Sequence, residues 1–371
     1  MVEHADVVII GGGIAGISLA GRIAHRRDVI VVEMEDHLGS HATGRSAAVY
    51  IEAYGSPTIR TLTTRSRTFF EEPPAGFSED SLVHPRGSLV FGGPENSDRL
   101  QREYAIASRS AMVRWLNPDD LLAYCPVLRP EAAFTGFIEP GARDIEADAL
   151  LQGFARMARQ GDARILTKSP VREIRWESDW LIVAGGAEIR AGIVVNAAGA
   201  WAEDISHRAG LQGRGLQPFR RTAATIPMPS DIASAVADLP VATAVDDSFY
   251  FKPEAGDMLV SLSEETLSPP CDAYPDDLDV AIALERFHDA TTVPRARPKA
   301  SWAGLRTFAP DRDPVVGYET DVPGFFWCAG QGGYGLQTAP ALSALAASIL
   351  LGEPLDPAEA DLAQALRPGR F

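Results

Sequence analysis

Short apolar runs separated by polar breaks divide the start of the chain into a strand, a helix and a second strand. Residues 5–10 (ADVVII) form a β-branched run without polar alternation, which is typical of a parallel strand covered on both faces. Apolar residues then recur at helical spacing at Ile14, Ile17, Ala20 and Ala24. Residues 29–32 (VIVV) form another β-branched run. The pattern predicts a strand–helix–strand unit of a parallel sheet.

The same reading predicts further elements along the chain. The expected helices are 58–70, 97–115, 148–160 and one that starts near Thr338, with Thr338 as N-cap and Pro340 in its first turn. The expected strands are 88–91, 134–138, 164–166, 171–176, 180–184, 193–196, 248–252 and 258–262. Because strands dominate residues 217–304, this stretch is a candidate second sheet.

Length and charge narrow the class of protein. The chain has 371 residues, enough for about two domains. A formal net charge of −16 disfavours binding to nucleic acid. Three cysteines without paired spacing favour a reducing compartment. With neither a leader pattern nor an apolar run long enough to span a bilayer, we expect a cytoplasmic protein.

The glycines between the first strand and helix carry the first chemical signal. Gly11, Gly13 and Gly16 have the spacing GxGxxG, in which the first permits a tight turn, the second a close backbone approach to a pyrophosphate and the third helix–strand packing. The helix N-terminus would face the phosphates. Glu33, at the end of the second strand, is placed to accept hydrogen bonds from ribose hydroxyls. The unit predicts dinucleotide binding, with NAD and FAD both open.

Other segments resemble one family over nearly the whole chain. The segments that carry the resemblance are 41–48 (HATGRSAA), 194–201 (VVNAAGAW), 330–337 (GQGGYGLQ), Gln217-Pro218, Arg220-Arg221, 248–250 (SFY) and 302–306 (WAGLR). They are similar to the FAD-contacting and substrate-contacting segments of the FAD-dependent D-amino acid oxidase and dehydrogenase family. Within that family the chain most resembles the bacterial D-arginine dehydrogenases.

The resemblance implies an α/β fold with a discontinuous Rossmann-type FAD-binding domain (residues 1–80, 145–216 and 305–371). An α+β substrate domain on a mostly antiparallel sheet would be inserted into it (residues 81–144 and 217–304). It also implies non-covalent FAD. The implied cofactor-binding residues are Gly11, Gly13, Ile14, Ala15, Gly16, Glu33, Met34, Arg45, Ser46, Ala47, Ala48, Val171, Ala198, Gly199, Trp201, Gly332, Gly333, Tyr334, Gly335 and Gln337.

The reaction implied by the resemblance is oxidation of a D-amino acid at its α-carbon, with hydride passing to flavin N5 and the imino acid hydrolysing to a 2-oxo acid and ammonia. Arg306 is the candidate clamp for the α-carboxylate, because a guanidinium can form two parallel charge-assisted bonds. Tyr250 would donate a third bond. Arg221 and Tyr54 match positions that line the same pocket, and the Gly333 carbonyl would fix the amine. A neutral amine needs no catalytic base.

The chain departs from the D-arginine dehydrogenases at the far end of the expected pocket. Ser88 stands where an acid should meet the guanidinium of the substrate, and Arg86 beside it has the wrong sign. Val49 replaces a polar residue. Glu52 and Glu264 could compensate, but we expect both to be solvated surface acids. The sequence therefore favours a neutral or apolar D-amino acid.

Several alternatives stay open. The fold would also suit an enzyme for N-methylated or cyclic amino acids such as sarcosine or proline. A non-catalytic nucleotide-binding protein and an NAD-linked dehydrogenase are weaker, the latter because there is one dinucleotide fingerprint. The electron acceptor is a quinone, another carrier or oxygen. We expect no metal site, because His37 and His41 lie in a glycine-rich loop without a third ligand, and we expect Cys328 to be a buried strand thiol.

Overall fold

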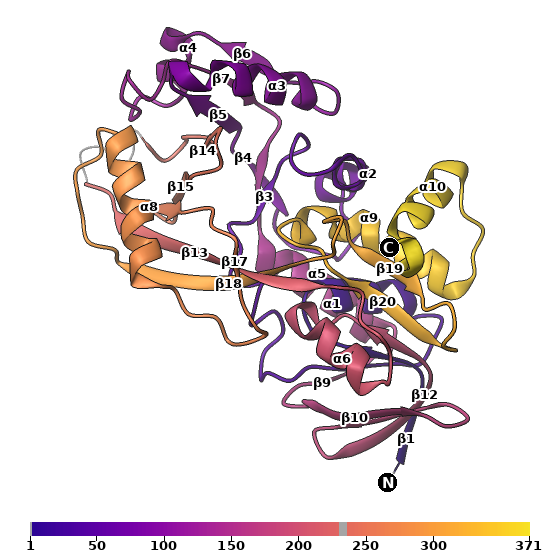
Figure 1. Cartoon of the computed structure of the whole chain (residues 1–371). Helices are drawn as coiled ribbons and strands as arrows, with labels where there is room; N and C mark the ends of the chain where they lie inside the picture. The colour runs from indigo at the N-terminus through magenta and orange to yellow at the C-terminus, as the bar shows by residue number, and fades with distance from the viewer. Residues whose placement is uncertain (1, 230–235) are drawn as a thin grey trace.

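The computed structural model describes residues 2–229 and 236–371, which form two large sheets with helices packed around them (Figure 1). In these residues the first sheet has eight strands, with β10-β11-β12-β1-β2-β9 in order and β20 and β19 continuing from β12. The strands are β1 (Val2–Ile10), β2 (Val29–Val32), β9 (Arg164–Leu166), β10 (Val171–Trp176), β11 (Trp180–Ala184), β12 (Ala187–Asn196), β19 (Val315–Tyr318) and β20 (Phe325–Ala329). Its centre, β9-β2-β1-β12-β20, is parallel.

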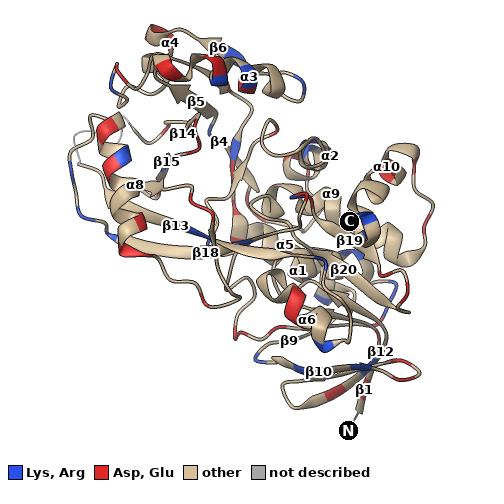
Figure 2. Ribbon diagram, viewed as in Figure 1, with Lys and Arg blue, Asp and Glu red and all other residues tan. Residues whose placement is uncertain are grey.

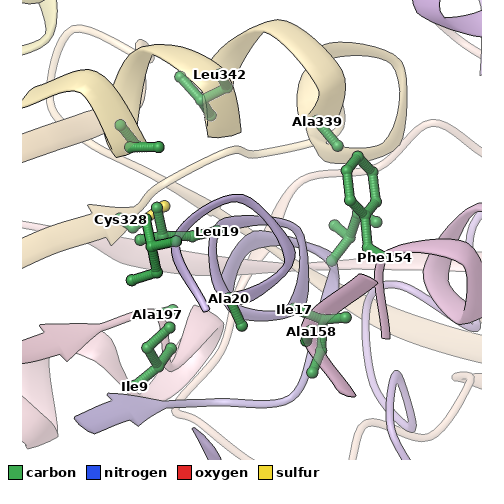
Figure 3. Close-up of a cluster of buried hydrophobic side chains, with 14 of the residues drawn as sticks. Ile9, Ile17, Leu19, Ala20, Phe154, Ala158, Ala197, Cys328, Ala339 and Leu342 are labelled. Carbon is green, nitrogen blue, oxygen red and sulfur yellow. The ribbon is translucent and has the colours of Figure 1, made fainter. Parts of the chain in front are cut away.

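Helices cover the first sheet, and residues 7–10 of β1 are buried on both faces. The helices of this half are α1 (Ile14–Ile23), α2 (Pro57–Glu71), α5 (Ala147–Gln160), α6 (Ala202–Arg208), α9 (Gly335–Leu351) and α10 (Pro357–Leu366), with short 3₁₀ turns η2 (Gly199–Trp201) and η3 (Pro368–Arg370). Val7 and Ile9 pack toward α1, α5 and α9, while Val8 and Ile10 pack on the opposite side against Trp180. Figure 3 shows α1 between Ile9 of β1 and Leu342 of α9. This double burial explains the uninterrupted apolar run of β1.

The second sheet has nine strands in the described residues, in the order β17-β13-β16-β15-β14-β5-β7-β6, with β18 paired to β13. They are β5 (Ser88–Gly92), β6 (Arg114–Leu116), β7 (Thr135–Glu139), β13 (Gln217–Pro227), β14 (Val241–Ala244), β15 (Tyr250–Glu254), β16 (Asp257–Ser261), β17 (Thr266–Leu267) and β18 (Ala300–Phe308). All pairs are antiparallel except β14 with β5. The helices of this half are η1 (Pro94–Asn96), α3 (Ser97–Ala107), α4 (Pro118–Tyr124) and α8 (Asp277–Ala290).

A small third sheet, β3-β8-β4, lies between the two large ones (Figure 1). Its strands are β3 (Val49–Tyr50), β4 (Val83–Pro85) and β8 (Arg143–Ile145). Acidic and basic residues are interspersed over both halves of the molecule (Figure 2). No helix in the described part of the chain is both long and apolar enough to cross a bilayer.

The architecture confirms the predicted fold class, a parallel α/β sheet with a second, mostly antiparallel sheet. Two element predictions are wrong. The helix predicted over 97–115 ends at Ala107, because residues 114–116 pair with β7 instead. The last long helix begins at Gly335, and Thr338 is not its N-cap but lies inside it, donating its hydroxyl to Tyr334 O at 2.8 Å. The domain boundaries stay a prediction.

Candidate active site

The glycine turn after β1 is shaped by close backbone packing. Gly11 has φ +114°, and a Cβ atom there would lie 2.3 Å from Ala197 O. At Gly16 a Cβ atom would lie 2.1 Å from Gly11 O, so this glycine allows α1 to pack on the turn. Thr43 Oγ1 accepts a hydrogen bond from the Ile14 N–H at 3.1 Å, where α1 begins. The tight turn at Gly11 and the close packing at Gly16 agree with the roles predicted for the first and third glycines, while the approach of the second to a pyrophosphate stays a prediction.

Glu33 lies at the end of β2, where the sequence placed a ribose-binding acid. The residue is 8% exposed, and its carboxylate accepts the N–H groups of Gly12 at 2.5 Å and Glu35 at 2.9 Å. A carboxylate has about four acceptor positions. The two backbone donors therefore orient the Glu33 carboxylate and leave acceptor positions free for hydrogen bonds from hydroxyl groups of a ligand.

A cavity of about 380 Å³ extends from this turn to the second sheet. Most predicted cofactor residues line it: Gly11, Gly13, Ile14, Ala15, Glu33, Met34, Arg45, Ser46, Ala47, Val171, Ala198, Gly199, Trp201, Gly332, Gly333 and Gly335. Gly16 lies behind the turn and does not line it. Ala48, Tyr334 and Gln337 line a neighbouring cavity instead. Residues that the sequence analysis missed also line the first cavity, among them Thr43, Asp204, Arg208, Cys271 and Gln331.

The residues of this cavity fit a dinucleotide. Besides the glycine turn and Glu33, Thr307 contributes a hydroxyl that is buried without a hydrogen-bond partner in the described chain. A buried polar atom of this kind calls for a ligand or water partner. The Trp201 ring packs against His41 at 4.7 Å between centroids, at the same wall as Val171 and Arg208. The cavity thus offers backbone donors, an acid and an aromatic surface in one elongated space.

A second cavity, of about 660 Å³, adjoins the first. The two share the lining residues Ser46, Ala47, Arg221, Tyr250, Arg306, Gly333 and Leu336. Four of the five predicted substrate-contacting residues therefore lie where the cavities meet. The fifth, Tyr54, lines the second cavity and packs on Tyr334 with ring centroids 5.0 Å apart.

Strand register explains why these side chains share one face of the second sheet. Arg306 pairs with Phe219, and Gly304, two residues away, pairs with Arg221, so the two arginines point to the same side. Ala223 continues this face and is joined through Ser261 to Tyr250. The residues paired in turn with Tyr250 on the neighbouring strands lie on the same face of the sheet. They are Thr243 of β14, Val90 of β5 and Phe137 of β7, and all three line the second cavity. The sheet face is the floor of this cavity.

Arg306 lies over Gly333, where an added Cβ atom would be 2.9 Å from the guanidinium carbon. The phenols of Tyr54, Tyr250 and Tyr334 surround the guanidinium. No carboxylate within residues 2–229 and 236–371 forms an ion pair with it. Burial raises the pKa of Tyr334, so its phenol stays protonated. Arg306 is a partly buried cation that faces both cavities and has no counter-ion in the described part of the chain.

Arg221 adds a second positive charge to the same place. Burial, followed by the positive charge of Arg306, lowers the pKa of Arg221 below its ordinary value. Its nearest ion-pair partner is Glu265, with the charged atoms 3.6 Å apart, and its Nε has no hydrogen-bond partner in the described chain. Two guanidiniums with so little compensation favour binding of an anion, and a carboxylate matches their geometry.

The far end of the second cavity differs from the sequence expectation. Ser88 lines it, as expected, but Arg86 does not, because its guanidinium binds Asp144 at 2.7 Å. The prediction that Glu52 is a surface acid is wrong. It is 6% exposed, accepts hydrogen bonds from Tyr50 and Arg67, and does not line the cavity.

The same prediction is wrong for Glu264. One of its oxygens accepts the Thr222 N–H at 2.5 Å and the other is buried without a hydrogen-bond partner in the described chain. Burial raises the pKa of this carboxyl. Cys328, in contrast, is buried in β20 as predicted.

The sequence analysis also missed Glu139, an acid that lines the second cavity and is 3% exposed. Glu139 lies directly opposite Ser88 across the β5–β7 pair. It follows an apolar strand and precedes Pro140 and Gly141, a position that on sequence alone is typical of an exposed turn. Only the pairing of β7 inside the sheet places it in the cavity.

Comparison with known proteins gives one family. The model of the FAD-dependent oxidoreductase family DAO matches residues 6–349. Glycine oxidase of Geobacillus kaustophilus is 25% identical over 361 residues, covering 94% of each chain. Human mitochondrial dimethylglycine dehydrogenase is 25% identical over 378 residues, which cover 95% of this chain and 43% of that protein. The chain therefore spans less than half the length of this second relative.

Solved structures share the fold over the full chain. The crystal structure of the Geobacillus kaustophilus glycine oxidase superimposes with a TM-score of 0.86 at 23% identity, covering 100% of this chain and 99% of that one. L-Proline dehydrogenase from P. horikoshii gives a TM-score of 0.85 at 21% identity, covering 100% and 98%. A dinucleotide cavity with a glycine turn, an adjoining cationic cavity and a family match across both sheets lead to one conclusion: the chain belongs to the DAO family of FAD-dependent oxidoreductases, and FAD is its cofactor.

Proposed function

We propose that this protein oxidises the α-carbon of a D-amino acid with a neutral or apolar side chain. Arg306 is the observation that carries the proposal, since it faces the junction of the FAD cavity and the second cavity without a counter-ion among the residues that the structure describes. A substrate α-carboxylate would neutralise it through two parallel hydrogen bonds. Tyr250 and Tyr54 would donate further bonds, and Arg221 would add attraction for the same anion.

This arrangement supplies positioning rather than a proton acceptor. Bound FAD supplies a two-electron acceptor for the α-carbon–hydrogen bond. With the carboxylate held at Arg306, the amine lies on the side of Gly333, whose carbonyl is proposed to accept its hydrogen bond. The imino acid then hydrolyses in water to a 2-oxo acid and ammonia. Ser88, Thr243 and Val241 at the cavity floor are neutral, and the nearby Glu139 carboxylate already accepts the backbone N–H groups of Glu52 and Ala53. This end of the cavity supports a substrate without a charged side chain.

A second candidate function is oxidation of N-methylated or cyclic amino acids. The names of the relatives favour it, since they include a dimethylglycine dehydrogenase, a glycine oxidase and a protein described as L-proline dehydrogenase. The D configuration rests on the resemblance of the site segments to D-amino acid oxidases and dehydrogenases. The three free cysteines agree with the proposed cytoplasmic location.

The test is anaerobic mixing of the FAD-loaded protein with amino acids while the flavin absorbance is followed. Bleaching by neutral D-isomers and not by their L-isomers supports the proposal. Bleaching by L-isomers alone refutes the configuration, and bleaching only by sarcosine, dimethylglycine or proline selects the second candidate. A flavin that no amino acid bleaches would show that the site does not oxidise them. Reoxidation of the bleached protein by oxygen or by a soluble quinone then identifies the acceptor class.

A further inference from the structure

Glu139 holds a segment of the second cavity wall through two backbone hydrogen bonds. Its carboxylate oxygens accept the N–H group of Glu52 at 2.8 Å and that of Ala53 at 3.1 Å. These two residues belong to the segment 51–56, between β3 and α2. The segment carries Tyr54, whose phenol lies beside the Arg306 guanidinium. Glu139 is therefore linked to the proposed substrate clamp through the backbone of this segment.

Other side chains hold the segment 51–56 at different points. At its start, Gln337 accepts the Ile51 N–H at 3.2 Å, and the Glu52 carboxylate bonds to Tyr50 and Arg67. At its end, Arg60 Nε donates to Gly55 O at 3.0 Å, and Ser56 caps α2 and bonds to Asp313. Glu139 holds the backbone N–H groups of the two residues directly before Tyr54, which is itself 40% exposed and packs on the Tyr334 ring. The hydrogen bonds to Glu139 are therefore the side-chain contacts that fix the backbone directly before Tyr54.

We propose that Glu139 is a positioning residue, whose carboxylate fixes the segment 51–56 so that Tyr54 stands beside Arg306 and completes the binding site for the substrate carboxylate. This inference rests on the proposed function, since it assigns Glu139 a role in the same site. Glu139 acts through the backbone of Glu52 and Ala53 and takes no part in the oxidation step. Its effect therefore falls on substrate binding.

The hold depends on the charge of Glu139. Burial raises the pKa of its carboxyl to about 7; the charge of Glu52 adds to this, while the two backbone N–H groups and Arg67 of α2 oppose it. Ser88, which lies opposite Glu139 on β5, is uncharged. A protonated carboxyl has one oxygen that is a weaker acceptor, so one of the two N–H groups loses its bond. The segment is held firmly above pH 7 and more loosely below it.

The test compares Glu139→Gln and Glu139→Asp with Glu131→Gln, an exposed acid that lines neither cavity and does not bond to the segment. A glutamine has one acceptor oxygen, so one N–H group is left without a partner. In the FAD-loaded protein we expect amide exchange of residues 51–56 in Glu139→Gln to rise about tenfold, and KM for the amino acid to rise by a similar factor with kcat nearly unchanged. Glu139→Asp, which keeps both oxygens, should lie between Glu139→Gln and the unaltered protein. Glu131→Gln should change neither quantity.

Binding of butanoate provides a second measurement, because this carboxylate has no amine that titrates. In the unaltered protein its Kd should rise as the pH falls through about 7, and this dependence should be absent in Glu139→Gln. If exchange, KM and the pH dependence of Glu139→Gln match those of the unaltered protein, the inference is wrong while the proposed function stands. If no amino acid reduces the flavin, the proposed function is wrong, and exchange at 51–56 still decides whether Glu139 holds the segment.

Should Glu139→Gln fail to fold, the unaltered protein remains a test. Its exchange at 51–56, corrected for the intrinsic pH dependence of amide exchange, should rise as the pH falls from 8 to about 6. Exchange that stays constant over this range would overturn the inference.

Discussion

Replacing Arg306 tests the proposed carboxylate clamp most directly. The guanidinium is partly buried, surrounded by phenols and without a carboxylate partner in the described chain, so its cost of burial is already part of the free protein. Two charge-assisted hydrogen bonds of about 1.5–3 kcal/mol each give about 3–6 kcal/mol of substrate binding. Arg306→Met should therefore weaken binding by roughly a hundredfold to ten thousandfold. Arg306→Lys keeps the charge without the planar fork and should lose less.

The assay is anaerobic reduction of the bound flavin at increasing amino acid concentration, which gives the apparent Kd separately from the limiting rate of reduction. Arg312→Gln is the control. Arg312 lines the same cavity, but it already pairs with Glu265 and lies over the Phe308 ring at 3.9 Å. We expect it to change the Kd by less than about threefold. If Arg306→Met binds the substrate as tightly as Arg312→Gln does, with full FAD content, Arg306 is not the clamp.

Three further predictions concern other parts of the site. Gly333→Ala should displace the Arg306 guanidinium, because the new Cβ would lie 2.9 Å from its carbon atom. KM for the amino acid should rise about tenfold or more without loss of FAD. Gly141→Ala, where nothing lies within 4 Å of the new Cβ, is the matched control, and equal KM values for the two variants would contradict the prediction. Glu33→Gln should raise the Kd for FAD about tenfold, because a neutral amide oxygen forms weaker hydrogen bonds with ribose hydroxyls than a carboxylate does. The Kd is measured by flavin fluorescence on titration of the apoprotein with FAD, and an unchanged Kd would place the ribose elsewhere. Glu139 should make the folded state less stable as the pH rises from 4.5 to about 7, because the folded chain then holds a proton that the unfolded chain has lost. The pKa difference corresponds to roughly 3 kcal/mol, seen as the pH-dependent difference in unfolding free energy between the unaltered protein and Glu139→Gln; parallel stability curves would disprove it.

The first sheet could be predicted from the sequence because its signals are local. The β-branched runs at residues 5–10 and 29–32, with a helical pattern between them, correspond to β1, β2 and α1 within a few residues. Glycines also mark the places where the backbone comes close, as at Gly11 and Gly16. Most of the predicted cofactor residues lie around one cavity because the turns that carry them follow neighbouring strands.

The errors occur where long-range pairing decides the structure. Residues 108–115 continue a helical pattern, but strand pairing with β7 ends the helix at Ala107. Thr338 has the chemistry of an N-cap, yet α9 begins one turn earlier, after Tyr334. The burial of Glu52 and Glu139 follows from contacts with Arg67 and with the backbone of residues 52 and 53, far away in the chain. Charged residues in turns are exposed by default, and no local pattern marks these exceptions.

The contact between the end of β18 and the glycine loop limits how substrate can enter. Thr307 O accepts the Gly332 N–H at 2.9 Å, directly beside Arg306, and Arg45 joins the same region through Ala273 O at 2.9 Å and Ala303 O at 3.0 Å. A hinge motion that separated the two large sheets would break these hydrogen bonds and move the Arg306 guanidinium away from the FAD cavity. A movement confined to the segment 51–56, which carries Tyr54, would leave these hydrogen bonds intact.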